Sequence, residues 1–199
     1  MDKEILRAHA EGLICLSGCL GGELQRTLWN KDNARAEEVL REYQGIFGKE
    51  NYYLEVMHHP GIERFEEIQA AIVALGKKHG IPLVATQDSH YLSPDDHRAH
   101  ETLLAINTQT DFGDADRLNF SESDDFSFLS PEVARERFKH IPEAVENTLK
   151  VAERCVLELP LGRWVFPEIQ TAKGGTHDSE LRQLAEEGFA ARGLTNTGE

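Results

Sequence analysis

Three short apolar runs stand out in the first half of the chain, and stretches with helical spacing lie between them. The runs occupy residues 12–17 (GLICLS), 52–56 (YYLEV) and 81–86 (IPLVAT), and their length and composition predict buried strands. In residues 31–47 and 62–79, apolar side chains recur three or four positions apart, which predicts two amphipathic helices. The pattern therefore predicts alternating strands and helices.

Capping signals support these helices and add a third one. Gly80 follows the second helix, where a glycine commonly marks the end. Ser93 and Pro94 form a serine cap followed by proline at the first helical position, so a third helix is expected from there to about Asn107. Three consecutive strand–loop–helix units favour right-handed crossovers. We therefore expect an α/β protein with a parallel sheet or barrel.

The second half of the chain has a different pattern. Residues 108–130 are acidic and rich in glycine, serine and aspartate, which predicts a long loop with one short strand. Two helices are predicted at residues 131–140 and 142–155, with Ser130 capping the first. Residues 157–169 are extended and interrupted by prolines, which is typical of a linker or an edge segment.

One further helix is predicted near the end of the chain. Either Asp178 or Ser179 is expected to cap it, and Gly193 is expected to end it. The sequence thus predicts an α/β body with a helical C-terminal extension.

Charge and composition exclude several classes of protein. The 199 residues include 21 Lys and Arg against 35 Asp and Glu, and the formal net charge of −14 opposes a module that tracks nucleic-acid phosphates. A hydrophobic fraction of 40% is too high for wholesale disorder, and no apolar run approaches the roughly 18 residues of a membrane span. The first residues do not resemble a signal peptide, and three cysteines make no disulfide framework. We therefore expect a cytoplasmic protein without membrane contact.

The first candidate site lies just after the third predicted strand, where Asp88 and His90 stand in the sequence QDSHY. In an extended segment, side chains two positions apart point to the same side. A carboxylate and an imidazole in that arrangement are suitable ligands for zinc, manganese or iron. The alternative interpretation is a helix-capping aspartate beside an incidental histidine.

Candidate ligands also follow the first two predicted strands. Cys19, in SGCLGG, is either a thiolate ligand or a small buried apolar residue. Glu55 and His59 fall on one side of the second strand, and we interpret Glu55 as solvated. Because parallel α/β folds build sites at the carboxyl ends of strands, Cys19, Asp88 and His90 are predicted to form one site, with His59 near it. A nucleophilic Cys19–His–Asp triad is an alternative, although Asp88 and His90 are better placed to share a metal than to orient each other.

Other residues and motifs are weaker candidates. His97 and His100 lie on neighbouring turns of the third helix; His97 is interpreted as solvated, and an approach of His100 to the same end of the sheet is not favoured. Cys15 and Cys155 are expected to lie in the core. The sequence contains no phosphate-binding G-x-x-x-x-G-K-[ST] loop, no G-x-G-x-x-G fingerprint and no G-x-S-x-G elbow.

Several segments together resemble the bacterial DNA polymerase III alpha-subunit family. In order along the chain they read GLICLSGCLGGEL, YYLEVMHHPG, HGIPLVATQDSHYLSPDDHRAHETLLAI, FSFLSPEVARERF and PEAVENTLKVAERCVLELPLG. The family's N-terminal PHP (polymerase and histidinol phosphatase) domain is a distorted seven-stranded (β/α) barrel with a metal cluster at the carboxyl ends of the strands. By resemblance, residues 1–160 are the C-terminal portion of that domain, and residues 161–199 are a linker and the start of the following polymerase region.

The resemblance also implies a ligand set. Cys19 matches the family's cysteine ligand, and Asp88 and His90 match its closing D-x-H pair. His59 matches a histidine common at this place, to which no ligand role is assigned. The implied cofactor is a divalent metal, zinc or manganese, bound at a partial site. No residue of the chain is assigned a catalytic role.

Some of the family's motifs have no counterpart in this sequence. These are the opening H-x-H pair, the D-H motif, a later glutamate and histidine, and the aspartates of the polymerase palm. We therefore expect the chain to be a piece of a larger enzyme, which by itself neither polymerises DNA nor hydrolyses phosphoesters efficiently.

Three functions are compatible with these features. In the first, the chain is part of a replicative DNA polymerase and contributes to the PHP metal site, which in complete relatives supports phosphoesterase or 3′–5′ exonuclease proofreading activity. In the second, it is a non-catalytic scaffold that stabilises the polymerase or docks a proofreading subunit. In the third, it is a stand-alone PHP phosphatase. The expected partners are other DNA polymerase III subunits, DNA through other regions of the polymerase and, for the isolated chain, a second copy.

Overall fold

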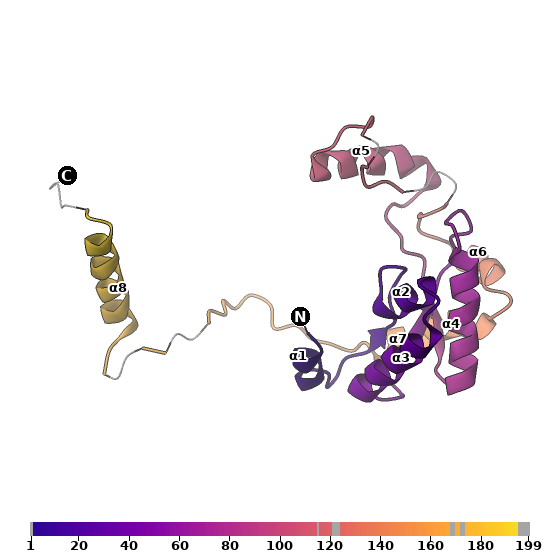
Figure 1. Cartoon of the computed structure of the whole chain (residues 1–199), viewed down its shortest axis with the longest axis horizontal. Coiled ribbons are helices and arrows are strands. Elements are labelled where there is room, and N and C mark those ends of the chain that lie inside the picture. Colours follow the sequence, from indigo (N-terminus) through magenta and orange to yellow (C-terminus); the bar gives the residue numbers. More distant parts are fainter. Residues whose placement is uncertain (1, 115, 121–123, 168–169, 172–173, 195–199) are drawn as a thin grey trace. The chain divides into compact units, whose positions relative to one another are not determined.

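A computed structural model of the chain describes residues 2–114, 116–120, 124–167, 170–171 and 174–194 (Figure 1). The chain divides into two compact units, Met1–Val156 and Leu157–Glu199, which are described separately below. The predicted boundary after residue 160 stays a prediction. Within the described ranges, no helix combines the length and apolar character needed to cross a membrane.

The first unit alternates helices and strands. Its elements are α1 (Lys3–Ala8), β1 (Cys15–Leu16), α2 (Glu23–Trp29), α3 (Asn33–Phe47), β2 (Tyr52–Val56), α4 (Phe65–His79), β3 (Leu83–Ala85), the 3-10 helix η1 (Pro94–Asp96), α5 (His97–Thr108), α6 (Pro131–Arg137) and α7 (Pro142–Arg154). The three predicted strands and the predicted helices at residues 31–47, 62–79, 131–140 and 142–155 are all present. Strand β2 has the predicted bounds, and the other elements are shorter than predicted. The short helices α1 and α2 have no counterpart in the sequence prediction.

The three strands form one parallel sheet in the order β1-β2-β3. Cys15 pairs with Tyr52, and Leu54 pairs with Leu83, so β2 lies between its two neighbours. Every residue of β2 is buried, which is typical of the central strand of a parallel sheet that helices cover. The predicted parallel α/β arrangement is thus confirmed.

The core forms where α3, α4 and α7 gather around this sheet (Figure 1). The predicted apolar faces of α3 and α4 are buried, with Leu40 and Ile72 fully inaccessible. Burying a side chain of this size contributes about 1.5–3 kcal/mol to the free energy of unfolding. As predicted, α4 ends at Gly80, whose φ of +65° is a conformation that glycine adopts without strain. The capping box of η1 pairs Ser93 with Asp96, which confirms the predicted start of the third helix.

The long loop after α5 has less regular structure than its sequence predicted. In its described part, residues 108–114, 116–120 and 124–130, there is no strand, and an isolated bridge joins Tyr91 to Ser127. The backbone N–H of His90 donates to the Phe126 carbonyl at 2.8 Å. The loop therefore returns to the segment that follows β3.

The second unit contains a long extended segment and one helix. Residues 157–167 hold exposed apolar side chains, including Trp164 and Phe166, whose rings stack with centroids 6.2 Å apart. Helix α8 spans His177–Ala191. Its cap is Thr176, which forms a capping box with Ser179, so the predicted cap at Asp178 or Ser179 is wrong by two or three residues.

Helix α7 covers the side of β3 that faces away from β2. Asn147 of α7 is 7% exposed, and its side-chain amide donates to the Leu83 carbonyl at 2.7 Å. This bond takes the place of a neighbouring strand at that carbonyl. The Asn147 Oδ1 in turn accepts from Lys150 Nζ at 2.9 Å.

Replacing Asn147 with alanine is expected to lower the free energy of unfolding by about 1–3 kcal/mol, because the buried Leu83 carbonyl loses its donor. Thr148→Ala is the matched control, since the Thr148 hydroxyl is exposed and donates only to the Val145 carbonyl of its own helix. Urea denaturation of both variants measures the difference. Equal losses would contradict a special role for the Asn147–Leu83 bond.

Candidate metal centre

The predicted ligands follow the carboxyl ends of three adjacent parallel strands. Cys19 lies in the turn after β1, His59 follows β2, and Asp88 and His90 follow β3. Because neighbouring parallel strands end at the same edge of a sheet, the topology brings these three segments to one edge. The positions of the side chains within those segments decide what they can bind.

Asp88 and His90 are in direct contact. The His90 Nε2 and Asp88 Oδ1 atoms are 3.1 Å apart, and the two side chains are 33% and 41% exposed. Asp88 has a φ of +56°, so a left-handed residue rather than a continuous extended segment brings the two side chains together. The helix-capping alternative for Asp88 is wrong, because Ser93 caps the following helix. The two side chains are thus within hydrogen-bonding distance of each other, and the prediction that they share a metal ion stays a prediction.

Aromatic side chains surround the exposed ring of His90. Its centroid lies 4.3 Å from that of Phe120 and 5.2 Å from that of His100. Burial, together with the neighbouring His90, lowers the pKa of His100, and the buried His100 Nδ1 has no hydrogen-bond partner among the described residues. His100 therefore approaches the candidate ligand pair, as its helical position allowed.

His59 is buried in an aromatic environment. It is 2% exposed, its ring stacks on Phe126 with centroids 4.4 Å apart, and Phe65 meets it edge-on at 5.4 Å. In the described part of the chain, neither ring nitrogen has a hydrogen-bond partner. Burial lowers the pKa of His59, and the charges of Asp124 and Asp88 oppose that shift. His59 is therefore held as a neutral imidazole, the form that binds metal ions.

Asp124 is a buried carboxylate beside His59 that the sequence analysis missed. It is 8% exposed, and its Oδ1 accepts from the Gly61 backbone N–H at 2.9 Å. Its Oδ2 is buried and has no partner among the described residues. Asp124 lies in the acidic loop at residues 108–130, where composition gave no signal that one carboxylate would fold back onto the end of β2.

The three cysteines differ in exposure and acidity. Cys19 is an exposed free thiol in the turn after β1. Burial, with a contribution from the Glu55 charge, raises the pKa of Cys15 to about 11, so Cys15 remains protonated at neutral pH. Cys155 is exposed, and its predicted core position is wrong because it follows the last turn of α7. Of the two exposed thiols, Cys19 is the one at the carboxyl edge of the sheet.

Glu55 is not the solvated residue that the sequence suggested. Its side chain is buried at 9% exposure in the central strand. The Oε2 atom accepts from the Gly18 backbone N–H at 3.0 Å, and Oε1 accepts from the Thr86 hydroxyl at 2.6 Å. Both carboxylate oxygens are thus engaged within the protein.

The candidate residues meet the chemical requirements of a metal only in part. Thiolate and imidazole donors suit zinc, carboxylates also suit manganese, and the nitrogens of His59 have no hydrogen-bond partner among the described residues. Asp88 and His90 form a contacting pair. Across the described residues, however, no group of three or more His, Cys, Asp or Glu side chains is close enough together to hold a metal ion. The arrangement therefore supplies part of a site.

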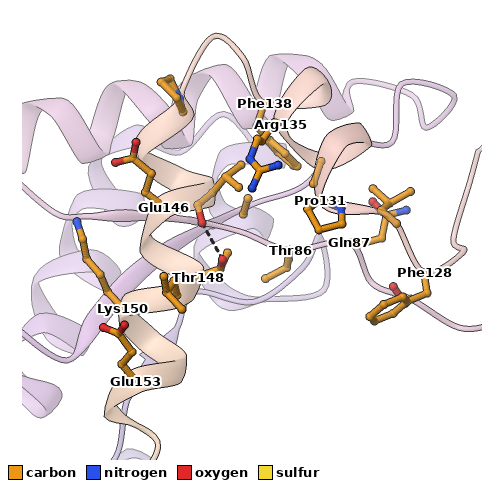
Figure 2. Close-up of a pocket in the computed structure, with 17 residues that line it drawn as sticks. Thr86, Gln87, Phe128, Pro131, Arg135, Phe138, Glu146, Thr148, Lys150 and Glu153 are labelled. Atoms are coloured by element: carbon orange, nitrogen blue, oxygen red, sulfur yellow. Dashed lines mark hydrogen bonds between the residues drawn. The ribbon is translucent and has the colours of Figure 1, made fainter.

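A large groove lies next to this edge but contains none of the four predicted ligands (Figure 2). Its volume is about 870 Å³, and Thr86 and Gln87 after β3, Phe128, and residues of α6 and α7 line it. Figure 2 shows Glu146, Lys150 and Glu153 along the α7 side. The groove is therefore distinct from the contacting Asp88–His90 pair.

The buried Glu101 side chain binds the backbone of Phe120, whose ring packs on His90. The Oε1 atom of Glu101 accepts from the Phe120 backbone N–H at 2.9 Å, and Oε2 accepts from Arg117 Nη1 at 2.6 Å. Burial alone would raise the pKa of Glu101, but the hydrogen bonds from Phe120 and Arg117 outweigh burial and lower it. The ionised carboxylate thus stabilises the Phe120 segment.

Glu101→Gln is expected to lower the free energy of unfolding at neutral pH by about 1.5–3 kcal/mol, the usual contribution of hydrogen bonds to a charged group. As the pH falls, the Glu101 carboxylate is protonated in the unfolded chain before it is protonated in the folded chain, because its pKa is lower in the folded chain. The stabilisation is therefore complete above the ordinary glutamate value of 4.5 and is lost as the pH falls through the lower folded pKa. Urea denaturation over that pH range should show the variant and the wild type converging.

Glu143→Gln is the control, because Glu143 is an exposed residue in the first turn of α7. A difference between Glu101→Gln and wild type that persists unchanged in acid would contradict the role of the Glu101 charge.

Comparisons with known proteins place these observations in a family. The PHP domain family matches residues 1–59. DNA polymerase III subunit alpha of Treponema pallidum is 41% identical over 193 residues, and those of Thermus aquaticus and Pseudomonas aeruginosa are 36% and 35% identical over 201 and 192 residues. Each alignment covers 96% of this chain and 16% of the relative, so the chain spans about a sixth of their length. The chain is therefore a relative of the DNA polymerase III alpha subunits over almost all of its length, and it includes PHP domain sequence.

Proposed function

We propose that the chain acts as part of a replicative DNA polymerase of the DNA polymerase III alpha type. Residues 1–160 would supply the later portion of the PHP domain, and residues 161–199 would lead into the next region. The 96% coverage of the chain by polymerase relatives supports this proposal over a stand-alone phosphatase. In the complete domain, the three-stranded parallel sheet would continue into a seven-stranded barrel.

Within that domain, we propose that Asp88 and His90 bind one zinc or manganese ion. Cys19 is the further ligand in the proposal, and His59 is a more peripheral one. The observation that carries it is the 3.1 Å contact between His90 Nε2 and Asp88 Oδ1 at the carboxyl end of β3. Two ligand atoms of one ion, each about 2.1 Å from it, stand about 3.0–3.4 Å apart, so the pair already has a suitable separation.

The metal would supply Lewis acidity toward a phosphate ester, and the chain's own residues would hold and orient it. Phe120 packs against the ring of His90 and restricts its orientation, and Asp88 lies beside that ring at the same end of β3. Phosphoesterase or 3′–5′ exonuclease proofreading would belong to the complete PHP domain.

A scaffold role is the second candidate function. The observation that favours it is that the described residues bring together only one contacting pair of candidate ligands, which is too few for a multinuclear cluster. In this case the domain would stabilise the polymerase or dock a proofreading subunit. In either case we propose a cytoplasmic location and contact with DNA through other regions. We also propose a second copy as a partner of the isolated chain, because β1 has a neighbouring strand on one side only among the described residues.

The purified chain is expected to bind Zn²⁺ or Mn²⁺, and His90→Ala is expected to weaken that binding by at least tenfold, because one of two contacting donors is removed. Titration calorimetry of the metal-free protein measures both affinities. His9→Ala, which removes an exposed histidine at the end of α1, serves as the control. Wild-type protein that binds neither metal would contradict the proposed site.

The isolated chain is expected to show no nucleotide incorporation and no turnover of a phosphodiester such as bis-p-nitrophenyl phosphate, with either metal present. The reason is that the described residues assemble only a pair of contacting ligands. Steady-state assays with zinc and manganese test this expectation. Hydrolysis that disappears in His90→Ala would show instead that the chain contains a complete active site.

A further inference from the structure

Glu55 connects both neighbours of the central strand. Its Oε2 accepts from the backbone N–H of Gly18, which follows β1, and its Oε1 accepts from the hydroxyl of Thr86, which follows β3. Gly18 directly precedes Cys19, and Thr86 stands two residues before Asp88. One buried carboxylate thus touches both segments that carry the proposed ligands.

The turn that carries Cys19 is also held from its other side. Gln25 of α2 is 1% exposed, and its Nε2 donates to the Gly18 carbonyl at 2.5 Å and to the Ser17 hydroxyl at 3.2 Å. The Ser17 Oγ accepts from the Glu55 backbone N–H at 2.9 Å. Gly18, with a φ of +84°, therefore has both its N–H and its carbonyl bound by side chains. These bonds restrict where Cys19 can lie relative to β2.

The turn itself is too tight to adjust independently. The Gly22 N–H donates to the Cys19 carbonyl at 2.7 Å, and a Cβ added at Gly22 would lie 2.7 Å from both the Ser17 carbonyl and the Gln25 side chain. A shift of the Gly18 end would therefore be passed on to Cys19. Because Glu55 joins Gly18 to Thr86 at the end of β3, it restricts the distance between the Cys19 turn and the segment that carries Asp88 and His90.

We propose that Glu55 is a positioning residue that sets the spacing between the Cys19 turn and the Asp88–His90 segment, and that it is not a ligand itself. This inference rests on the proposed function, in which those residues bind one ion. Both of its carboxylate oxygens are engaged by protein donors, so it acts on the ion only through the two segments it joins.

Comparing Glu55→Gln with Glu55→Met separates positioning from charge. Glutamine keeps both links, because its carbonyl accepts from Gly18 and its amide donates to the Thr86 hydroxyl, which can also accept. Methionine has a similar length but keeps neither link. With Co²⁺ as the probe, we expect Glu55→Met to raise the dissociation constant about 10–100-fold, as loss of a group that supports metal ligands does, and Glu55→Gln to stay close to wild type.

The Co²⁺ titration has two outcomes that overturn the proposal. Equal losses in Glu55→Gln and Glu55→Met would show that the negative charge matters rather than the links. Unchanged affinity in Glu55→Met would show that the spacing does not depend on Glu55. If Glu55→Met does not fold, Thr86→Val replaces it in the titration, because valine keeps the shape of threonine and removes one link.

Hydrogen exchange in the metal-free chain tests the link without relying on metal binding. We expect Thr86→Val to speed exchange in residues 17–22 as well as in residues 86–90. Without its bond to the Thr86 hydroxyl, the Glu55 carboxylate is more mobile, and its bond to the Gly18 N–H weakens as well. Thr27→Val, which removes a hydroxyl that donates only to the Leu24 carbonyl within α2, should change neither segment. Faster exchange confined to residues 86–90 would overturn the proposal. A wild-type chain that binds no Co²⁺ would refute the proposed metal site, and the exchange measurement would then decide the role of Glu55 by itself.

Discussion

The parallel pairing of β2 with one strand on each side is the constraint on which the candidate site depends. Because β1, β2 and β3 run in the same direction, their carboxyl ends meet at one edge, and segments distant in sequence are brought together there. The central strand is buried along its whole length, so a polar side chain on it must find partners inside the protein. Glu55 satisfies that requirement by binding Gly18 and Thr86, one from each neighbouring segment.

The histidines at this edge lie among aromatic rings rather than in open solvent. Phe65 and Phe126 enclose His59, and Phe120 packs on His90. Around the buried His59, such surroundings favour the neutral imidazole and strengthen its interaction with nearby charges, since the local dielectric constant is lower than in water. The Asp124 Oδ2 beside His59 is a buried acceptor without a partner in the described part of the chain. Buried polar atoms of this kind are usually satisfied by water or an ion, which is consistent with a metal-binding edge.

Local sequence patterns predicted the helices and strands well, but they predicted only some of the residues at the candidate site. The bounds of β2 followed from its length and composition. The apolar faces of α3 and α4 followed from periodicity, because one buried face imposes its spacing on the sequence. The Asp88–His90 pair was also visible, since its members lie two residues apart. By contrast, Asp124 and the buried links of Glu55 involve partners tens of residues away, for which a single sequence carries no local signal.

The sequence by itself determined that strands and helices alternate, that helices begin and end at capping residues such as Ser93 and Gly80, and that side chains of types able to bind metals follow the strands. These features depend on backbone preferences and on neighbours within one or two turns. Only the tertiary structure decided that Glu55 is buried and that Cys155 is exposed. It also decided that His90 meets Asp88 through a left-handed residue. Burial and contact depend on which distant segments pack together, and that is settled by the sheet and its covering helices rather than by any local stretch of chain.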